Sequence, residues 1–201
     1  MTIPVLSRQW AHSTSTGDVY ATGSLLLVLF DYNHPRFVSY YESNPRPPRP
    51  IVLSRVYHGI KASATQQEQA KILASVFALH LAVLDPEASA IETDLCFQLQ
   101  QDSDAHFSYY LRRSNAFWRH ALKAISEAVK EENMEAKQHG RAVCLALFRT
   151  AGSLVHLVKE PHDVSEERRA IAKVWAEEGL FECLDQTVDK LLQIPEVTSE
   201  P

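Results

Sequence analysis

The sequence predicts an all-α fold with about eight to ten helices. Apolar residues recur at steps of three and four along most of the chain, and no segment competes with a sustained strand-like alternation. Only 6 glycines occur in 201 residues, which leaves few positions for hairpin turns. A hydrophobic content of 45% with 22% charged residues is typical of a globular domain.

We expect one helical domain over residues 17–194. Residues 1–16 are expected to form a flexible arm, because a polar Ser/Thr run leads into Gly17. Residues 195–201 follow the last helical pattern and are expected to fray.

The first helix is predicted from about Asp18 to Tyr32, followed by a short helix after Pro35. The proline-rich segment 44–50 predicts a loop, since proline lacks the amide donor that a helix interior needs. Residues 51–60 fit either a helix or an extended strand.

Thr65 and Glu68 have the spacing of a capping box, which predicts a helix start. Apolar residues then cover nearly the whole helix circumference as far as Leu84, a pattern typical of a buried central helix. The sequence Asp-Pro-Glu at 85–87 predicts the start of the next helix, which continues to about Leu99.

The second half begins after a polar break at 100–104, with a helix through Phe107 and a bend near Ser114. A clean three/four repeat follows from Phe117, and residues 130–138 are interpreted as a solvated face or helix end. A second all-round apolar helix is predicted over 142–158, closed by Pro161.

Two amphipathic patterns separated by Gly179 run from Arg168 to Leu192. They predict a terminal helix pair, beginning at Asp163 or Ser165 and packed on the helix at 142–158.

The segment 177–181, Glu-Glu-Gly-Leu-Phe, with the apolar face that follows it, resembles the end of an armadillo repeat. The helix at 142–158 resembles the buried middle helix of such a unit, whereas no regular period of about 40 residues is visible. The resemblance implies an irregular armadillo-like stack, and an orthogonal helical bundle stays open. The chain is also similar to the helical regions of fungal MYND-type zinc finger proteins, without the zinc finger.

Composition excludes several partners. A formal net charge of −5 gives no basic surface for nucleic acid, and the apolar run at 25–30 is too short to span a membrane. The odd, widely spaced cysteines Cys96, Cys144 and Cys183 do not suggest a disulfide framework. We therefore expect a reducing compartment, cytoplasmic or nuclear.

No catalytic, cofactor-binding or metal-binding residue is predicted. The nine histidines lack metal-ligand spacing, and neither a phosphate-binding loop nor a nucleophile elbow is present. His80 is interpreted as a core histidine, with a buried general base as the alternative. Cys144 would form a thiolate pair with His156 or His120 only if the fold brought them together.

The segment 109–120 interleaves three arginines with large aromatic residues, the types that most often anchor protein interfaces. In the alternative interpretation, Phe117 and Trp118 belong to the core and the arginines to a solvated face. The predicted protein-binding residues are Tyr109, Tyr110, Arg112, Arg113 and Asn115.

These patterns favour a non-enzymatic protein-binding or scaffold module that acts through a helical surface or by self-association. The alternative is an enzyme or small-ligand binder with a pocket between the apolar helices, for which His80, Cys144 and His156 are the candidates. A third possibility is one segment of a larger helical scaffold.

Overall fold

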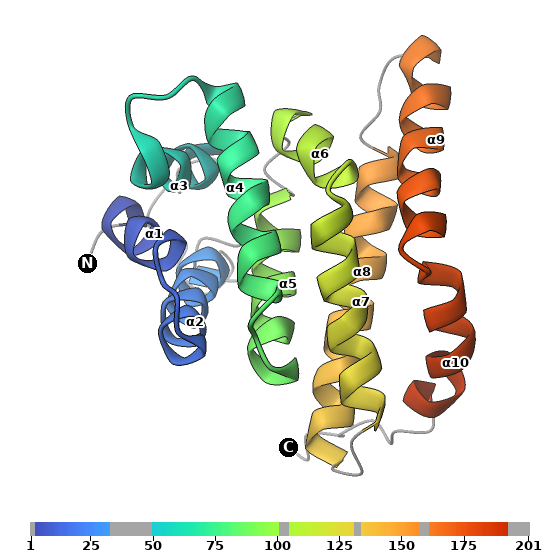
Figure 1. The fold of residues 1–201 in the computed structure, drawn as a ribbon. Helices are drawn as coiled ribbons and strands as arrows, with labels where there is room; N and C mark the ends of the chain where they lie inside the picture. Colours follow the sequence, from blue (N-terminus) through green and yellow to red (C-terminus); the bar gives the residue numbers. More distant parts are fainter. Residues whose placement is uncertain (1–2, 33–49, 101–104, 131–133, 157–160, 193–201) are drawn as a thin grey trace, which may run out of the picture.

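The fold is all-α, as the sequence predicts. The computed structural model describes residues 3–32, 50–100, 105–130, 134–156 and 161–192, and in these ranges every regular element is a helix (Figure 1). The ten helices are α1 (Ile3–Ala11), α2 (Thr16–Tyr32), α3 (Pro50–Lys61), α4 (Gln66–Leu81), α5 (Pro86–Gln100), α6 (Ala105–Arg112), α7 (Asn115–Lys130), α8 (Met134–His156), α9 (Pro161–Glu177) and α10 (Leu180–Leu192).

Long helices pack in two layers. In Figure 1, α5 and α8 lie behind α4 and α7, and both run in the direction opposite to the helix in front. Helix α2 lies beside α5 and runs in the same direction. Thr16, at the start of α2, hydrogen-bonds to Val83 just before α5, and Gly23, further along α2, lies beside Ile91, further along α5. On the far side of α5, the Gln100 side-chain amide reaches the Thr150 carbonyl of α8. Helices α2, α5 and α8 therefore form one layer.

Two consecutive segments share the same order of helices. Residues 50–100 and residues 105–156 each contain a short helix followed by two long antiparallel helices, α3–α4–α5 and α6–α7–α8. The short helix has 12 residues in the first segment and 8 in the second. The ambiguous segment at 51–60 is thus resolved as helix α3.

Several predicted helix boundaries are confirmed. Thr65 and Glu68 form the reciprocal capping box of α4, and the Asp85 carboxylate accepts a 2.8 Å hydrogen bond from the Ala88 amide at the start of α5. The Ser114 hydroxyl accepts from the Phe117 amide where α6 gives way to α7. Gly179, with φ 74°, separates α9 from α10.

The prediction of a flexible arm at 1–16 is wrong for residues 3–11, which form α1. Only three of its nine residues are polar, and Leu6 and Trp10 stand one helical turn apart and are both buried. Ile3, Leu6 and Trp10 fall on one helical face, a signal that the sequence analysis missed, and that face packs on α3, α4 and α5.

Two more predictions need correction. Helix α4 is not buried all round, because Leu79 is 68% exposed and Val83, just beyond it, is 59% exposed. Helix α8 begins at Met134 and passes through Gly140, and Pro161 opens α9 rather than closing α8. A proline fits the first turn of a helix because that turn needs no amide donor there.

Helices α9 and α10 follow one another end to end along one side of the molecule (Figure 1). They pack on α7 as well as on α8, whereas the sequence suggested α8 alone. The predicted loop at 44–49, the short helix after Pro35 and the tail at 195–201 lie outside the described residues.

Candidate functional site

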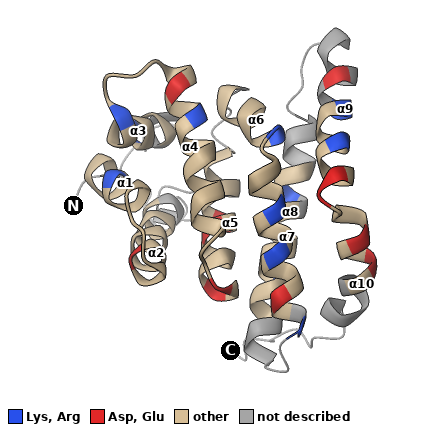
Figure 2. Ribbon diagram, in the orientation of Figure 1, with Lys and Arg blue, Asp and Glu red and all other residues tan. Residues whose placement is uncertain are grey.

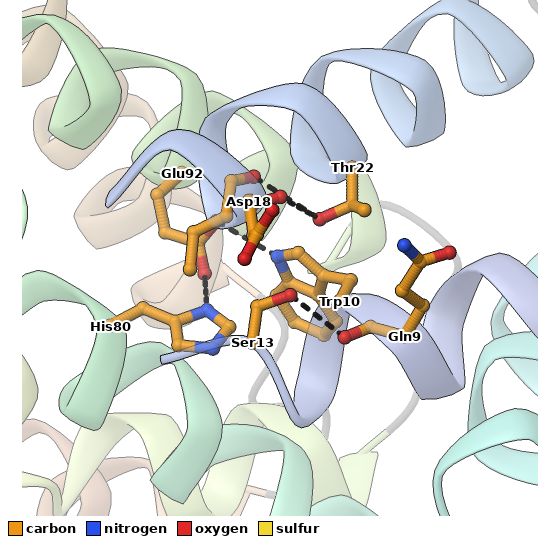
Figure 3. A network of polar contacts seen from close by, with 8 residues as sticks. Gln9, Trp10, Ser13, Asp18, Thr22, His80 and Glu92 are labelled. Atoms are coloured by element: carbon orange, nitrogen blue, oxygen red, sulfur yellow. Dashed lines mark hydrogen bonds and ion pairs between the residues drawn. The ribbon is translucent and has the colours of Figure 1, made fainter. Parts of the chain in front are cut away.

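A buried polar network joins three helices near the N-terminus (Figure 3). The Trp10 indole Nε1 of α1 donates a 3.1 Å hydrogen bond to Glu92 Oε2 of α5. The other carboxylate oxygen, Oε1, lies 2.7 Å from His80 Nδ1 of α4. Trp10 and Glu92 have no exposed surface, and His80 is 4% exposed. The network therefore fixes α1 against α4 and α5.

Burial controls the electrostatics of this network. Loss of water raises the pKa of the Glu92 carboxyl above its ordinary value, and the hydrogen bonds from His80 and Trp10 oppose that shift. The Trp10 ring also packs edge-on against His80 and Phe77, with ring centroids 5.1 Å away in each case. The Trp10 side chain is thus held by both a hydrogen bond and aromatic contacts.

A carboxyl group beside an imidazole has the composition of an acid–base pair. Neither Glu92 nor His80, however, lines either of the two cavities described below. The geometry agrees with His80 as a hydrogen-bonded core histidine. Sequence reasoning missed Glu92, although it lies on the buried stripe of Ala88, Leu95 and Leu99, where a carboxylate signals a buried partner.

Of the other suspected catalytic residues, Cys144 does not join His80. Cys144 lines a separate apolar cavity between α7, α8, α9 and α10. Burial raises the pKa of its thiol to about 11, so the nucleophilic thiolate is disfavoured at neutral pH. The side chain of His156 lies outside the described residues.

The five predicted protein-binding residues fall into two environments. Tyr109, Tyr110 and Arg113 lie together at the end of α6, with the Arg113 guanidinium 3.9 Å from the centre of the Tyr109 ring. Tyr109 is 42% exposed, and its ring packs edge-on against Tyr110. The Tyr110 hydroxyl accepts a hydrogen bond from Gln67 of α4. These three residues remain candidates for surface contact.

Arg112 and Asn115 make contacts within the protein. Arg112 is only 7% exposed. The Asn115 side-chain amide donates to carboxylates at the end of α9, at 3.2 Å to Glu177 and 3.0 Å to Glu178. Arg119 adds two hydrogen bonds to Glu178, of 2.7 and 2.9 Å. This polar contact attaches the α9–α10 junction to α7.

A groove of about 410 Å³ lies over α5, between α2 and α8. Apolar atoms come from all three helices, and Tyr20 and Leu145 are exposed at the two sides, by 37% and 48%. Ile91 of α5 lies between them. The lining residues are Tyr20, Glu87, Ala90, Ile91, Asp94, His139, Ala142, Leu145, Ala146 and Arg149.

The groove carries opposite charges at its two ends. Glu87 is in the first turn of α5, where Figure 2 shows acidic residues, and it accepts a hydrogen bond from Tyr20 that raises the pKa of the Tyr20 phenol. Arg149 lies 5.9 Å from the ring of Phe97, ten positions further along α5. Ten helical residues rise about 15 Å, so the two charges stand that far apart along the groove.

Two other kinds of feature, a metal-ligand cluster and a membrane-spanning helix, are absent from the described ranges. No three His, Cys, Asp or Glu side chains among them gather where they could hold a metal ion, and none of their helices is both long and apolar enough to cross a membrane. Comparison of the chain with protein-family models, curated proteins and solved structures finds no match.

Proposed function

We propose that this chain is a protein-binding module whose groove over α5 takes an amphipathic helix from a partner protein. The observation that carries the proposal is the groove itself, which has apolar residues from three helices, Glu87 at one end, Asp94 further along α5 and Arg149 at the other end. Helices commonly dock by laying an apolar stripe into such a groove.

Charge complementarity defines the partner. A helix of about ten residues covers the distance from Glu87 to Arg149. Its apolar stripe would pack on Ile91, Tyr20 and Leu145, with a basic residue facing Glu87 and an acidic residue facing Arg149. Contacts of this kind set the orientation of a partner more than its affinity.

The helix order adds support for an armadillo-like stack. Two successive segments, 50–100 and 105–156, repeat the order of one short and two long helices, and α2, α5 and α8 lie in one layer. Stacked helical units of this type present extended surfaces for other proteins.

Selection from a displayed library of helical peptides tests the proposal. The peptides share an apolar stripe and vary at all other positions. We expect the enriched sequences to carry a basic residue at one end and an acidic residue at the other. Binding should weaken by at least about tenfold, or 1.4 kcal/mol, in Leu145→Asp.

Leu79→Asp provides a matched control, because Leu79 is an exposed leucine on α4 in the other layer. It should leave peptide affinity unchanged. Arg149→Glu should weaken the selected peptides, and changing their acidic end residue to lysine should restore affinity. Failure to enrich any peptide, or equal binding to Leu145→Asp, would refute the groove as the binding site.

A further inference from the structure

A second cavity, separate from the groove, lies between the last four helices. Its volume is about 120 Å³. Helices α7 and α8 supply five of its lining residues, and α9 and α10 supply the other four. They are Trp118, Ile125, Cys144, Leu147, Ala151, Trp175, Leu180, Phe181 and Leu184.

The wall of this cavity is apolar and uncharged. The Trp118 indole Nε1 donates to the Leu111 carbonyl at 3.2 Å, so its polar atom is already bonded within the protein. Cys144 is the only lining side chain of an ionisable type among the described residues, and burial keeps its thiol protonated by raising its pKa to about 11. The Trp175 indole Nε1 is buried and has no hydrogen-bond partner among the described residues, so the wall offers one N–H donor and no group that would compensate a charged ligand for its lost hydration.

The cavity has a buried floor and a partly open rim. Its lining residues on α7 and α8 are all buried, Ala151 at 9% being the most exposed. On α9 and α10, by contrast, Phe181 is 57% exposed and Trp175 and Leu184 are partly exposed. Entry from solvent therefore lies on the α9–α10 side, beside the junction at Gly179.

Size and shape select the ligand class. Apolar cavities of about 150 Å³ stay dry and bind benzene, so a cavity of this size suits about six to eight non-hydrogen atoms. The Trp118 and Trp175 rings meet edge to face, with centroids 5.4 Å apart. Aromatic walls favour an aromatic guest in an offset or edge-on arrangement.

We propose that this cavity binds a neutral, single-ring aromatic molecule, or the phenyl group of a larger apolar ligand that enters past Phe181. The binding is independent of the groove over α5, since the two sites share no lining residue among those described.

Titration with benzene, followed by NMR of the indole N–H signals, tests the proposal directly on the unmodified protein. The chain has three tryptophans, two of which line the cavity, whereas Trp10 belongs to the polar network with Glu92. We expect saturable shifts of the Trp118 and Trp175 signals and no shift of Trp10. Benzoate, which adds a charged carboxylate to the same ring, should bind at least about tenfold more weakly.

Two alanines on α8 provide a matched pair of variants. Ala151→Leu should fill the cavity and abolish the benzene shifts. Ala142→Leu, at an exposed position in the groove, should leave them unchanged. Absence of saturable shifts up to the solubility limit of benzene, or equal shifts of all three tryptophans, would overturn the proposal even if Ala151→Leu failed to fold.

Discussion

The Glu92 carboxylate of α5 lies 2.7 Å from the His80 imidazole of α4 inside the protein core. Each residue is almost fully buried, and the indole of Trp10 closes the network from α1. A buried carboxyl without these partners would be strongly destabilising. The pair therefore makes the N-terminal helix part of the core, and it also makes stability depend on a titrating group.

The variant Glu92→Gln should remove that pH dependence. Because the pKa of Glu92 is raised in the folded protein, the unfolded chain releases its proton first as pH rises from the ordinary glutamate value of about 4.3. The folding stability that the protonated Glu92 carboxyl contributes is fully present below that pH. It is lost as the pH rises through the pKa that Glu92 has in the folded protein. Glutamine cannot titrate, so the stability of the variant relative to the native protein should increase across this window.

Urea unfolding from about pH 4 to about pH 8 measures the effect. Glu87→Gln, an exposed position on the same helix, is the control and should give no such increase. Parallel pH curves for Glu92→Gln and the native protein would show that the buried carboxyl has no raised pKa.

Local sequence signals predicted several of the helix starts and breaks. Thr65 with Glu68, Asp85 and Gly179 act within one helical turn, so their roles can be recognised from neighbouring residues alone. Apolar periodicity identified most helices. It could not identify Leu79 as exposed, because periodicity does not show which side of a helix lacks a neighbour.

The candidate sites depend on contacts between distant segments. Trp10 and Glu92 are 82 positions apart, and the groove forms only where α2, α5 and α8 lie side by side. The aromatic and arginine pattern at 109–120 gave a plausible surface, but Arg112 became buried and Asn115 bonded to the end of α9. No local pattern shows that Arg112 is buried or that Asn115 bonds to a distant helix.

Gly59→Ala should detach α1 from α3. A Cβ atom at Gly59 would lie 2.3 Å from the Pro4 carbonyl oxygen and 2.9 Å from Pro4 Cα, and both are backbone atoms that cannot move aside alone. We expect faster hydrogen exchange across α1 and a changed Trp10 environment, detected by NMR. Gly17→Ala is the control, since nothing lies within 4 Å of its Cβ. Equal protection of α1 in both variants would contradict this prediction.

The ion pair between Arg119 and Glu178 should stabilise the α9–α10 junction. A double-mutant cycle with Arg119→Met and Glu178→Gln should give a small favourable coupling, because Arg119 is largely exposed and water screens the pair. The hydrogen bond from Arg119 lowers the pKa of Glu178, so this coupling is present above the ordinary glutamate value of about 4.3 and lost as pH falls through the folded pKa.

The exposed pair Lys123–Glu127, at 3.6 Å, is the comparison for that cycle. The coupling between Lys123 and Glu127 should be smaller, about 0.3 kcal/mol, because the two side chains stand one turn apart on the same helix and make a single contact. If both pairs showed the same coupling, the bidentate contact at the junction would contribute nothing beyond an ordinary surface ion pair.

Gly179→Ala should destabilise the protein by about 1 kcal/mol, because a φ of 74° is unfavourable for a residue with a Cβ. Space is not the cause, since the nearest atom to an added Cβ is Glu182 Oε2 at 3.7 Å. Gly179→Asn should cost less than alanine, as asparagine adopts this conformation more readily. Chemical unfolding of both variants measures the order. Equal losses for alanine and asparagine would indicate crowding by the side chain, and no loss would mean that the backbone at Gly179 relaxes without strain.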